Sequence, residues 1–451
     1  MKLKTFKVVG VWGFLTKEIS FRDHTTFLIG INGSGKTTIL KLLDGLLKPN
    51  LKNLLFIDFK EISIIFSGDD SPLDVSKIVC KKYNDRMVIL FHKPYKHIYS
   101  EHRVNFDGIE FPTKHIEHSD YERMYYFFQK SEVYGLIKEL PTPVIVGLNR
   151  LLTDEEDDEH MSVFHPSMRN SIPLSLVDQN DDISEALKQV RDLIYDHIRE
   201  NARKQSTLAD EFKNQVFDEM LTPPQNSDLS HSNSNDYLKV KELKELLNDK
   251  IVVKETKQLT NKIKEYLSEY QAVIDEFRKA DFNKLMDSAG KEQMILRKML
   301  AFNAQFDKIY RVGQIAINNM KQIENLHAPI NRFEKSVNLF FNEGLKEIKV
   351  GGSGDLYIIN RNLGADINQS IFDLSSGEKQ IIILMAYLSF KSSSKIFIVD
   401  EPEVSLHVSW QEKFVDALME ASPDNQFVLA THAPSIIARS NRRTWCEDLS
   451  K

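Results

Sequence analysis

The sequence contains little cysteine and no long hydrophobic run. Cys80 and Cys446 are its two cysteines and lie far apart among 451 residues, so we expect no disulfide framework and a reducing cytosol. No window approaches the roughly 20 apolar residues that a membrane span requires. The N-terminus also lacks the apolar block of a signal peptide. These absences predict a cytoplasmic protein that does not enter a membrane.

The chain also lacks an excess of basic residues. Its 59 lysines and arginines are outnumbered by 65 acidic residues, giving a net charge of −6. The whole chain therefore carries no electrostatic footprint for nucleic acid. Two short basic clusters, at residues 77–82 and 439–443, are more typical of solvated faces than of a phosphate track. The contents of 41% hydrophobic and 27% charged residues are those of a globular protein with two or three domains.

A glycine-rich loop, GINGSGKT at residues 30–37, is the first motif that carries chemistry. It follows an apolar strand-like segment at 25–30 and precedes a segment at 36–47 with helical apolar spacing, which is the context in which GxxxxGK[ST] binds phosphate. In such a loop the backbone amides surround phosphate oxygens at a helix N-terminus. We expect ATP to bind through Asn32, Gly33, Ser34, Gly35, Lys36, Thr37 and Thr38.

Two carboxylates follow a second apolar strand-like segment, at residues 396–400. With a phosphate loop upstream, Asp400 is expected to hold Mg²⁺ through water and the Thr37 hydroxyl to ligate the ion directly, while Lys36 reaches the β- and γ-phosphates. Glu401 would then be the catalytic carboxylate that orients or deprotonates the attacking water. The sequence thus predicts ATP and Mg²⁺ as cofactors of a hydrolytic site.

Two further motifs appear only after residue 373. The segment LSSGE at 374–378 resembles the signature motif of ABC-type ATPases, with Ser376 where glycine is usual and Glu378 where glutamine is common. The resemblance implies that Ser375 binds the γ-phosphate held by another subunit and that Gly377 opens the following helix. It also implies that His432 is the catalytic switch histidine, and that two heads hydrolyse ATP as a head-to-tail dimer or within a higher homo-oligomer.

The run DEPEVSLH at 400–407 is more discriminating, because it resembles the RecF/OLD-like ATPases of the AAA15 and AAA21 groups, which are related to the SMC and Rad50 heads. The resemblance covers about residues 1–150 and 330–440. It implies an α/β fold, an ABC-type ATPase head with a mixed sheet and an antiparallel β layer, and a long helical or coiled-coil insertion.

The pattern along the chain fits three parts. Residues 1–150 form the N-terminal half of the head, and short β-rich runs around a turn at Asn84–Asp85 predict its antiparallel layer. Residues 151–345 form a helical insertion, which contains an acidic loop at 154–159 and a flexible linker rich in Pro, Ser and Asn at 223–235. Residues 346–451 form the C-terminal half. The two helical stretches could pair as an antiparallel hairpin, but their irregular heptads favour a short bundle over a long coiled coil.

The family also suggests a function. The chain resembles the ATPases of PARIS- or Septu-type anti-phage defence, which implies an ATP-dependent scaffold or sensor that controls a separately encoded nuclease or toxin effector. A phage protein or DNA is the candidate trigger. No nuclease site and no Toprim domain are recognisable in the sequence, so a partner is expected to cut. The alternative is a RecF/SMC-like ATPase that binds DNA directly in repair or recombination.

Two positions of the nucleotide site stay open at this level. Gln129 is the first glutamine after the phosphate loop, so either it or another residue takes the place of the glutamine that senses Mg²⁺ in this superfamily. The aromatic residue that stacks on adenine could be Phe6, Trp12 or Phe14, and each of these is also a candidate for the core.

Overall fold

The chain divides into two compact units. The computed structural model describes residues 2–48, 51–67, 76–92, 99–105, 118–140, 144–147, 180–222, 236–248, 257–280, 290–361, 367–390, 396–437 and 440–450. The first unit combines residues 1–194 with 330–451, and the second comprises residues 195–329. The two ends of the sequence therefore fold together into one body.

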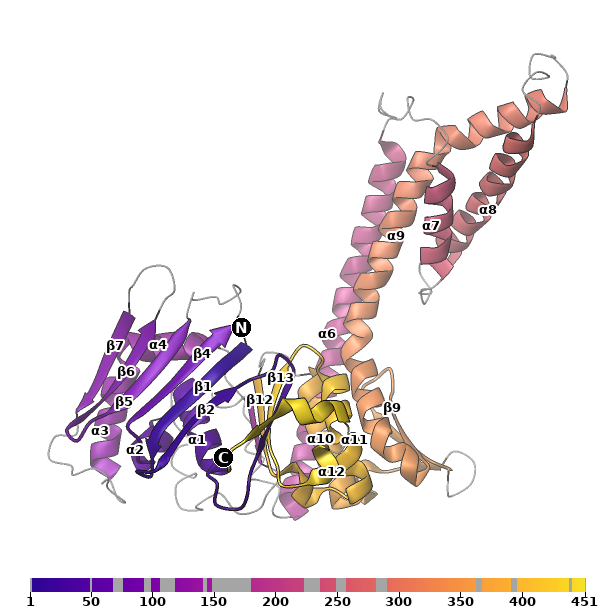
Figure 1. Ribbon diagram of the computed structural model, residues 1–451. Helices are drawn as coiled ribbons and strands as arrows, with labels where there is room; N and C mark the ends of the chain where they lie inside the picture. The colour runs from indigo at the N-terminus through magenta and orange to yellow at the C-terminus, as the bar shows by residue number, and fades with distance from the viewer. Residues whose placement is uncertain are drawn as a thin grey trace. The chain divides into compact units, whose positions relative to one another are not determined.

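A parallel sheet forms the centre of the first unit (Figure 1). In the described part of the chain its order is β14-β3-β13-β12-β8, and every neighbouring pair is parallel. Strands β12 and β13 are buried at almost every position, as expected when both faces of a parallel sheet are covered. The strands are β3 (Thr25–Ile29), β8 (Val144–Gly147), β12 (Ile396–Asp400), β13 (Gln426–Ala430) and β14 (Cys446–Asp448).

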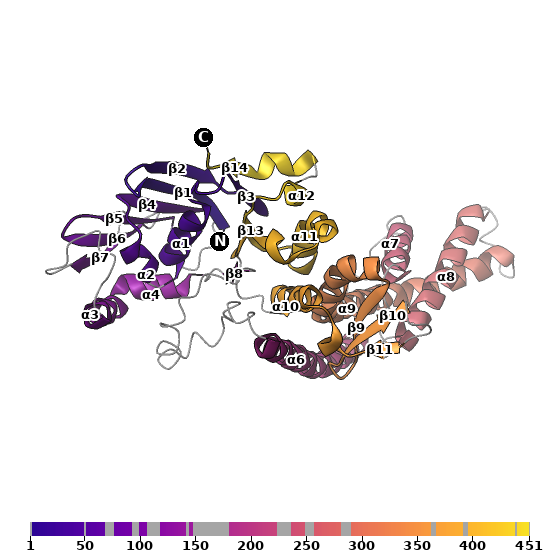
Figure 2. The ribbon, with the colours of Figure 1, turned by 90° about the horizontal axis from the view of Figure 1, so that it is seen from below.

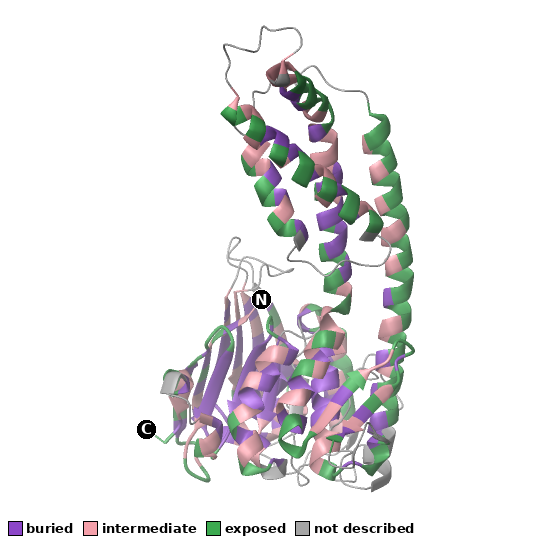
Figure 3. Ribbon diagram, turned by 90° about the vertical axis from the view of Figure 1, so that its right-hand side faces the viewer, coloured by how far each residue is buried: buried purple, intermediate pink, exposed green. Residues whose placement is uncertain are grey.

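The predicted antiparallel β layer is also present. Its order is β2-β1-β4-β5-β6-β7, and β5 and β6 pair as a hairpin whose turn contains Asn84 and Asp85. The buried side chains of its strands join one hydrophobic core with those of β12 and β13, and these buried positions appear in Figure 3. The strands are β1 (Lys2–Val11), β2 (Leu15–Ser20), β4 (Glu61–Ser67), β5 (Lys77–Lys82), β6 (Arg86–His92) and β7 (Tyr99–Asn105).

Helices and a small third sheet complete the first unit. Helix α1 packs on β12 and β13, and α10 packs on α11. The apolar residues of α1 that the sequence spacing places on one face are fully buried, which anchors the end of the phosphate loop. The helices are α1 (Lys36–Leu47), α2 (Lys52–Phe56), α3 (His118–Gln129), α4 (Glu132–Glu139), α10 (Ser376–Phe390), α11 (Val408–Ala421) and α12 (Pro434–Ile437), and the sheet is β9 (Lys346–Val350), β10 (Leu356–Asn360) and β11 (Ile367–Gln369).

Two long helices, α6 (Asn180–Leu221) and α9 (Lys291–Phe341), supply most of the second unit (Figure 1). Two hydrogen bonds show that these helices run antiparallel. Asn201 donates to the Leu326 carbonyl, and Asn319 donates to the Leu208 carbonyl. Helices α7 (Asp236–Asn248) and α8 (Lys257–Lys279) pack with α9 around a core of aliphatic and aromatic side chains.

The helical hairpin is therefore present, but the preference for a short bundle over long paired helices is wrong in part. Irregular heptads do not prevent the pairing, since side-chain amide groups bridge α6 and α9 to backbone carbonyls. The acidic loop at 154–159 and the linker at 223–235 lie outside the described residues, and domain boundaries at 150 and 345 stay a prediction. No helix in the described residues is long and apolar enough to cross a membrane.

Candidate nucleotide-binding site

Three loops meet at one edge of the parallel sheet. Leu28 of β3 pairs with Ala430 of β13, which in turn pairs with Asp400 of β12. Because these strands are parallel, the segments that follow them leave the sheet at the same edge. The phosphate loop, the two carboxylates and His432 therefore come together, although they are far apart in the sequence.

The phosphate loop has a backbone that glycine alone adopts easily. Gly33 and Gly35 have φ angles of 83° and 90°, in the left-handed region. A Cβ atom on Gly35 would also lie 2.9 Å from the Cδ2 atom of Leu15. Gly35 is the N-cap of α1, and the first turn of that helix carries no acidic residue. The arrangement leaves a helix N-terminus ready to accept an anion.

Lys36 is directed back across the loop. Its Nζ atom donates to the carbonyls of Gly30 and Ile31, at 3.0 and 3.3 Å, and lies 3.4 Å from the Nδ1 atom of His432. The side chain is only 5% exposed, and this burial lowers its pKa, although nearby carboxylates including Glu401 act in the opposite direction. A buried cation held by weak neutral acceptors is well suited to exchange them for phosphate oxygens.

Thr37 and Asp400 form the second contact between the loop and the sheet. The Thr37 hydroxyl donates to Oδ2 of Asp400 at 3.0 Å, while Oδ1 is buried without a hydrogen-bond partner in the part of the chain that the structure describes. Burial raises the pKa of Asp400. A buried carboxylate oxygen without a partner is costly, and a cation would satisfy it. The oxygen donors of Thr37 and Asp400 therefore fit Mg²⁺.

The described residues contain no group of three or more His, Cys, Asp or Glu side chains that could hold a metal ion by themselves. Mg²⁺ binds to proteins mostly through one or two carboxylates together with substrate phosphates and water.

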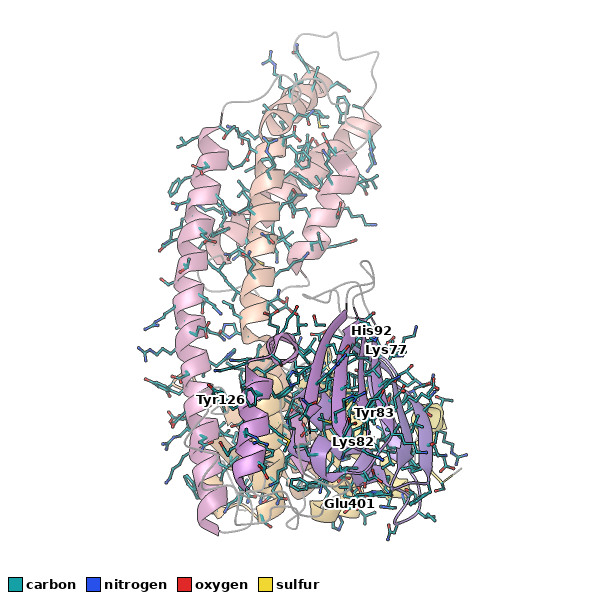
Figure 4. All side chains as sticks on the ribbon, turned by 90° about the vertical axis from the view of Figure 1, so that its left-hand side faces the viewer. Lys77, Lys82, Tyr83, His92, Tyr126 and Glu401 are labelled. Carbon is teal, nitrogen blue, oxygen red and sulfur yellow. The ribbon has the colours of Figure 1, made fainter. Side chains whose placement is uncertain are left out.

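Glu401 leaves β12 with a strained backbone. Its φ angle of 47° is unusual for a residue with a side chain, and its N–H donates to the Ala430 carbonyl at 2.8 Å. Figure 4 labels the side chain in the first unit. Strain of this kind persists where the surrounding structure enforces it and is concentrated at functional sites.

Glu403, which the motif analysis did not single out, also belongs to this site. Its carboxylate accepts hydrogen bonds from the Thr431 hydroxyl and from the His432 backbone N–H, at 2.8 and 2.7 Å. The second glutamate of the DEPE run at 400–403 was visible in the sequence. Its role was not, because the two partners follow a different strand.

The signature segment is not joined to the phosphate loop. Both the N–H and the hydroxyl of Ser375 donate to Oε2 of Glu378 at 2.9 Å, and Lys346 binds Oε1 of Glu378 at 2.7 Å. No hydrogen bond among the described residues links Ser375 or Gly377 to residues 30–37. Figure 2 shows α10, which contains Gly377, beside α11, with α1 among the strands of the N-terminal half.

The structure reduces the candidates for the aromatic residue that stacks on adenine and for the glutamine that senses Mg²⁺. Phe6 is fully buried in the core, so it cannot stack on a base, whereas Trp12 and Phe14 are 50% and 77% exposed in the turn between β1 and β2. Gln129 ends α3, and its side chain hydrogen-bonds with Tyr134, whose pKa is raised to about 12 mainly by burial. Nothing in the described residues joins Gln129 to the loops at the sheet edge.

The fold and the clustered motifs define a phosphate-loop nucleotide-binding protein. The chain belongs to the family of AAA ATPase domains designated AAA_15, whose model matches residues 1–437. The protein thus contains an AAA ATPase domain, and the predicted AAA15 resemblance is confirmed.

The named relatives match only short parts of the chain, and a solved structure that aligns over most of it has low sequence identity. The chain is 27% identical to "Retron Vc95 probable ATPase" of Vibrio cholerae over 27% of its length and 25% of the relative. It is 23% identical to "Retron Ec83 probable ATPase" of Escherichia coli over 32% and 29% of the two chains. The matches thus span about a quarter of these relatives. An Smc head domain of Pyrococcus furiosus aligns over 97% of this chain and 91% of that one, at 14% identity and a TM-score of 0.38.

Proposed function

We propose that the chain is the ATP-hydrolysing subunit of a prokaryotic anti-phage defence complex. ATP pairs two copies head to tail, and the pair acts as a scaffold that controls a separately encoded nuclease or toxin effector. The observation that carries the pairing is the exposed Ser375, which contacts its own Glu378 and no residue of the phosphate loop. Such a segment completes a nucleotide site only on another copy.

Within one copy, residues 32–38 surround the phosphates of ATP. The backbone amides at the N-terminus of α1 bind phosphate oxygens, and the Lys36 ammonium exchanges its carbonyl partners for the β- and γ-phosphates. Thr37 and Asp400 would hold Mg²⁺, and the ion would neutralise negative charge on the phosphate oxygens.

Hydrolysis uses the two groups that follow β12 and β13. Glu401 orients a water molecule in line with the γ-phosphate and accepts its proton as the new oxygen–phosphorus bond forms. The bond between the γ-phosphorus and the β-phosphate oxygen breaks, which yields ADP and inorganic phosphate, while Glu401 retains the proton taken from water. His432 lies 3.4 Å from the Lys36 ammonium and contacts the γ-phosphate, so it distinguishes ATP from ADP.

The names of two similar proteins support the defence role. Two relatives are named as retron ATPases, which favours an ATPase that serves a larger system. A phage protein or DNA would then act as the trigger through a surface of the complex.

A RecF/SMC-like DNA-binding ATPase is the second candidate. The antiparallel pairing of α6 and α9 over a long distance favours it, because long helical arms suit a protein that encloses a polymer. The net charge of −6 favours the first candidate, since non-specific DNA binding rests on basic surface.

The test uses Glu401→Gln, which should bind ATP without hydrolysing it at a normal rate. Mass photometry is measured with and without ATP, for the chain alone and co-expressed with the product of the adjacent gene. ATP-dependent particles that retain this neighbour support the defence scaffold. A dimer that ignores the neighbour and captures duplex DNA supports the DNA-binding ATPase, and a monomer at saturating ATP contradicts the pairing of heads. Glu412→Gln, at an exposed position of α11, is the control.

A further inference from the structure

Glu403 connects the ends of two neighbouring strands. It lies in a short 3₁₀ helix at Pro402–Ser405, directly after β12. Oε2 accepts from the hydroxyl of Thr431, and Oε1 accepts from the backbone N–H of His432. Thr431 is fully buried, so this contact is shielded from water. Both carboxylate oxygens are therefore engaged by the segment that carries the switch histidine.

The direction of these hydrogen bonds requires a carboxylate. The Thr431 oxygen already accepts from the Ala433 N–H at 3.0 Å, so its single proton is directed to Glu403. The His432 N–H is also a donor. Two donors face the two oxygens of Glu403, and a glutamine amide would present an NH₂ group to one of them.

A second set of contacts closes a ring around the same segment. The buried Gln411 of α11 donates to the backbone carbonyls of Glu403 and Leu406, at 3.1 and 3.0 Å. Its Oε1 atom accepts from the hydroxyl of Ser435, three residues after His432. The segment after β13 is thus linked to the segment after β12 at both of its ends. One link is the direct contact with Glu403, and the other passes through Gln411.

This ring holds the backbone from which the His432 side chain extends. Glu403 accepts from the backbone N–H of His432, and the Nδ1 atom of the same residue lies 3.4 Å from Nζ of Lys36. We propose that Glu403 is a positioning residue for ATP hydrolysis. It keeps His432 in place relative to Glu401, so that the γ-phosphate contact and the attacking water meet the same phosphorus. The inference rests on the role proposed above for His432.

The experiment measures steady-state ATP hydrolysis and ATP affinity for the full chain. Because a small misplacement of a group in the transition state is costly, Glu403→Gln should lower kcat by about 10- to 100-fold. KM and the dissociation constant for ATP should stay within about twofold, because Lys36 and residues 32–38 still bind the phosphates. Glu412→Gln removes an exposed carboxylate of α11 and should leave both parameters unchanged.

A double-mutant cycle separates positioning from a general structural role. If Glu403 acts through His432, Glu403→Gln should change kcat by less than about twofold in a His432→Ala background, because coupled residues are not additive. Multiplied losses would overturn the inference while leaving the role of His432 intact. A normal kcat for His432→Ala would refute both the histidine assignment and the positioning, whereas Lys36→Ala reports on nucleotide binding separately.

A second pair of variants covers the case in which Glu403→Gln does not fold. Thr431→Val removes one donor to Glu403 while keeping the shape of the side chain, and Thr431→Ser keeps the donor. Thr431→Val should lower kcat at unchanged KM, and Thr431→Ser should restore most of it. Equal rates for the two variants would count against the inference.

Discussion

The ion pair behind the signature segment gives a prediction that the structure makes quantitative. Lys346 of β9 binds Glu378 at 2.7 Å, and the two side chains are only 18% and 12% exposed. Glu378 also accepts from the N–H and hydroxyl of Ser375, which caps α10. Lys346→Met therefore leaves a half-buried carboxylate without its cation, at the helix end where the proposed trans-acting serine lies.

The free energy of unfolding that Lys346→Met loses lies between two known limits. Losing one partner of a fully buried pair costs about 3–5 kcal/mol, and losing an exposed pair costs about 0.2–1 kcal/mol. Since Glu378 keeps its two contacts with Ser375, we expect Lys346→Met to lower the free energy of unfolding by about 2 kcal/mol at pH 7. Lys349→Met is the matched control, because the pair of Lys349 with Glu347 is 54% and 23% exposed and should be worth less than about 1 kcal/mol.

The loss should depend on pH in a defined direction. Burial acts to raise the pKa of Glu378, but the contacts with Lys346 and Ser375 outweigh it and the pKa is lowered. The native state thus binds fewer protons than the unfolded state near the ordinary glutamate pKa, and stability is gained as pH rises. The contribution is complete above a pKa of about 4.3 and is lost as pH falls through the folded value. The difference between wild type and Lys346→Met should therefore shrink as pH falls below about 4.

Urea unfolding followed by tryptophan fluorescence measures this directly. Trp12, Trp410 and Trp445 all lie in the first compact unit, so their signal reports on the body that contains the ion pair. A loss no larger than that of Lys349→Met, or one that is unchanged at about pH 3, would refute the reasoning.

Three further predictions concern other contacts. Lys36→Ala should abolish detectable ATP binding in a fluorescent-nucleotide titration, and near-normal affinity would contradict the phosphate assignment. Lys82 (Figure 4) donates to the carbonyls of three residues, so Lys82→Met should cost about 1–3 kcal/mol. Because burial lowers its pKa to about 8, the unfolded chain binds more protons above that pH, and the loss should grow between pH 8 and 10 in urea titrations. Arg442→Met removes a fully buried cation from Asp416 and should cost about 3 kcal/mol by the same titration at pH 7, and a loss below 1 kcal/mol would contradict this.

The local motifs of the site could be predicted from the sequence better than the way in which the fold brings them together. A phosphate loop between a strand and a helix is a local pattern, because the glycine conformations, the strand and the helix are all encoded within residues 25–47. The carboxylates after β12 were readable for the same reason. Thr37 and Asp400 were both expected at the Mg²⁺ site, and the structure joins them by a hydrogen bond of 3.0 Å.

Other features had no local signal. Phe6 has the same aromatic character as Trp12, but only the sheet decides that one is core and the other exposed. The length of the α6–α9 pairing was underestimated, because amide contacts such as that of Asn201 with the Leu326 carbonyl leave no heptad pattern. The role of Glu403 was missed because its partners follow β13.

The sequence by itself determined the ATPase family, the phosphate loop and the residues proposed to hold ATP and Mg²⁺, because these depend on short stretches whose backbone preferences are local. Tertiary structure alone decided which of these residues meet. The parallel order β3-β13-β12 brings loops from both ends of the chain to one edge of a sheet, and it leaves Ser375 bound to Glu378 without a hydrogen bond to the described loop at 30–37. Strand order is a property of long-range packing, so no single segment of the sequence contains it.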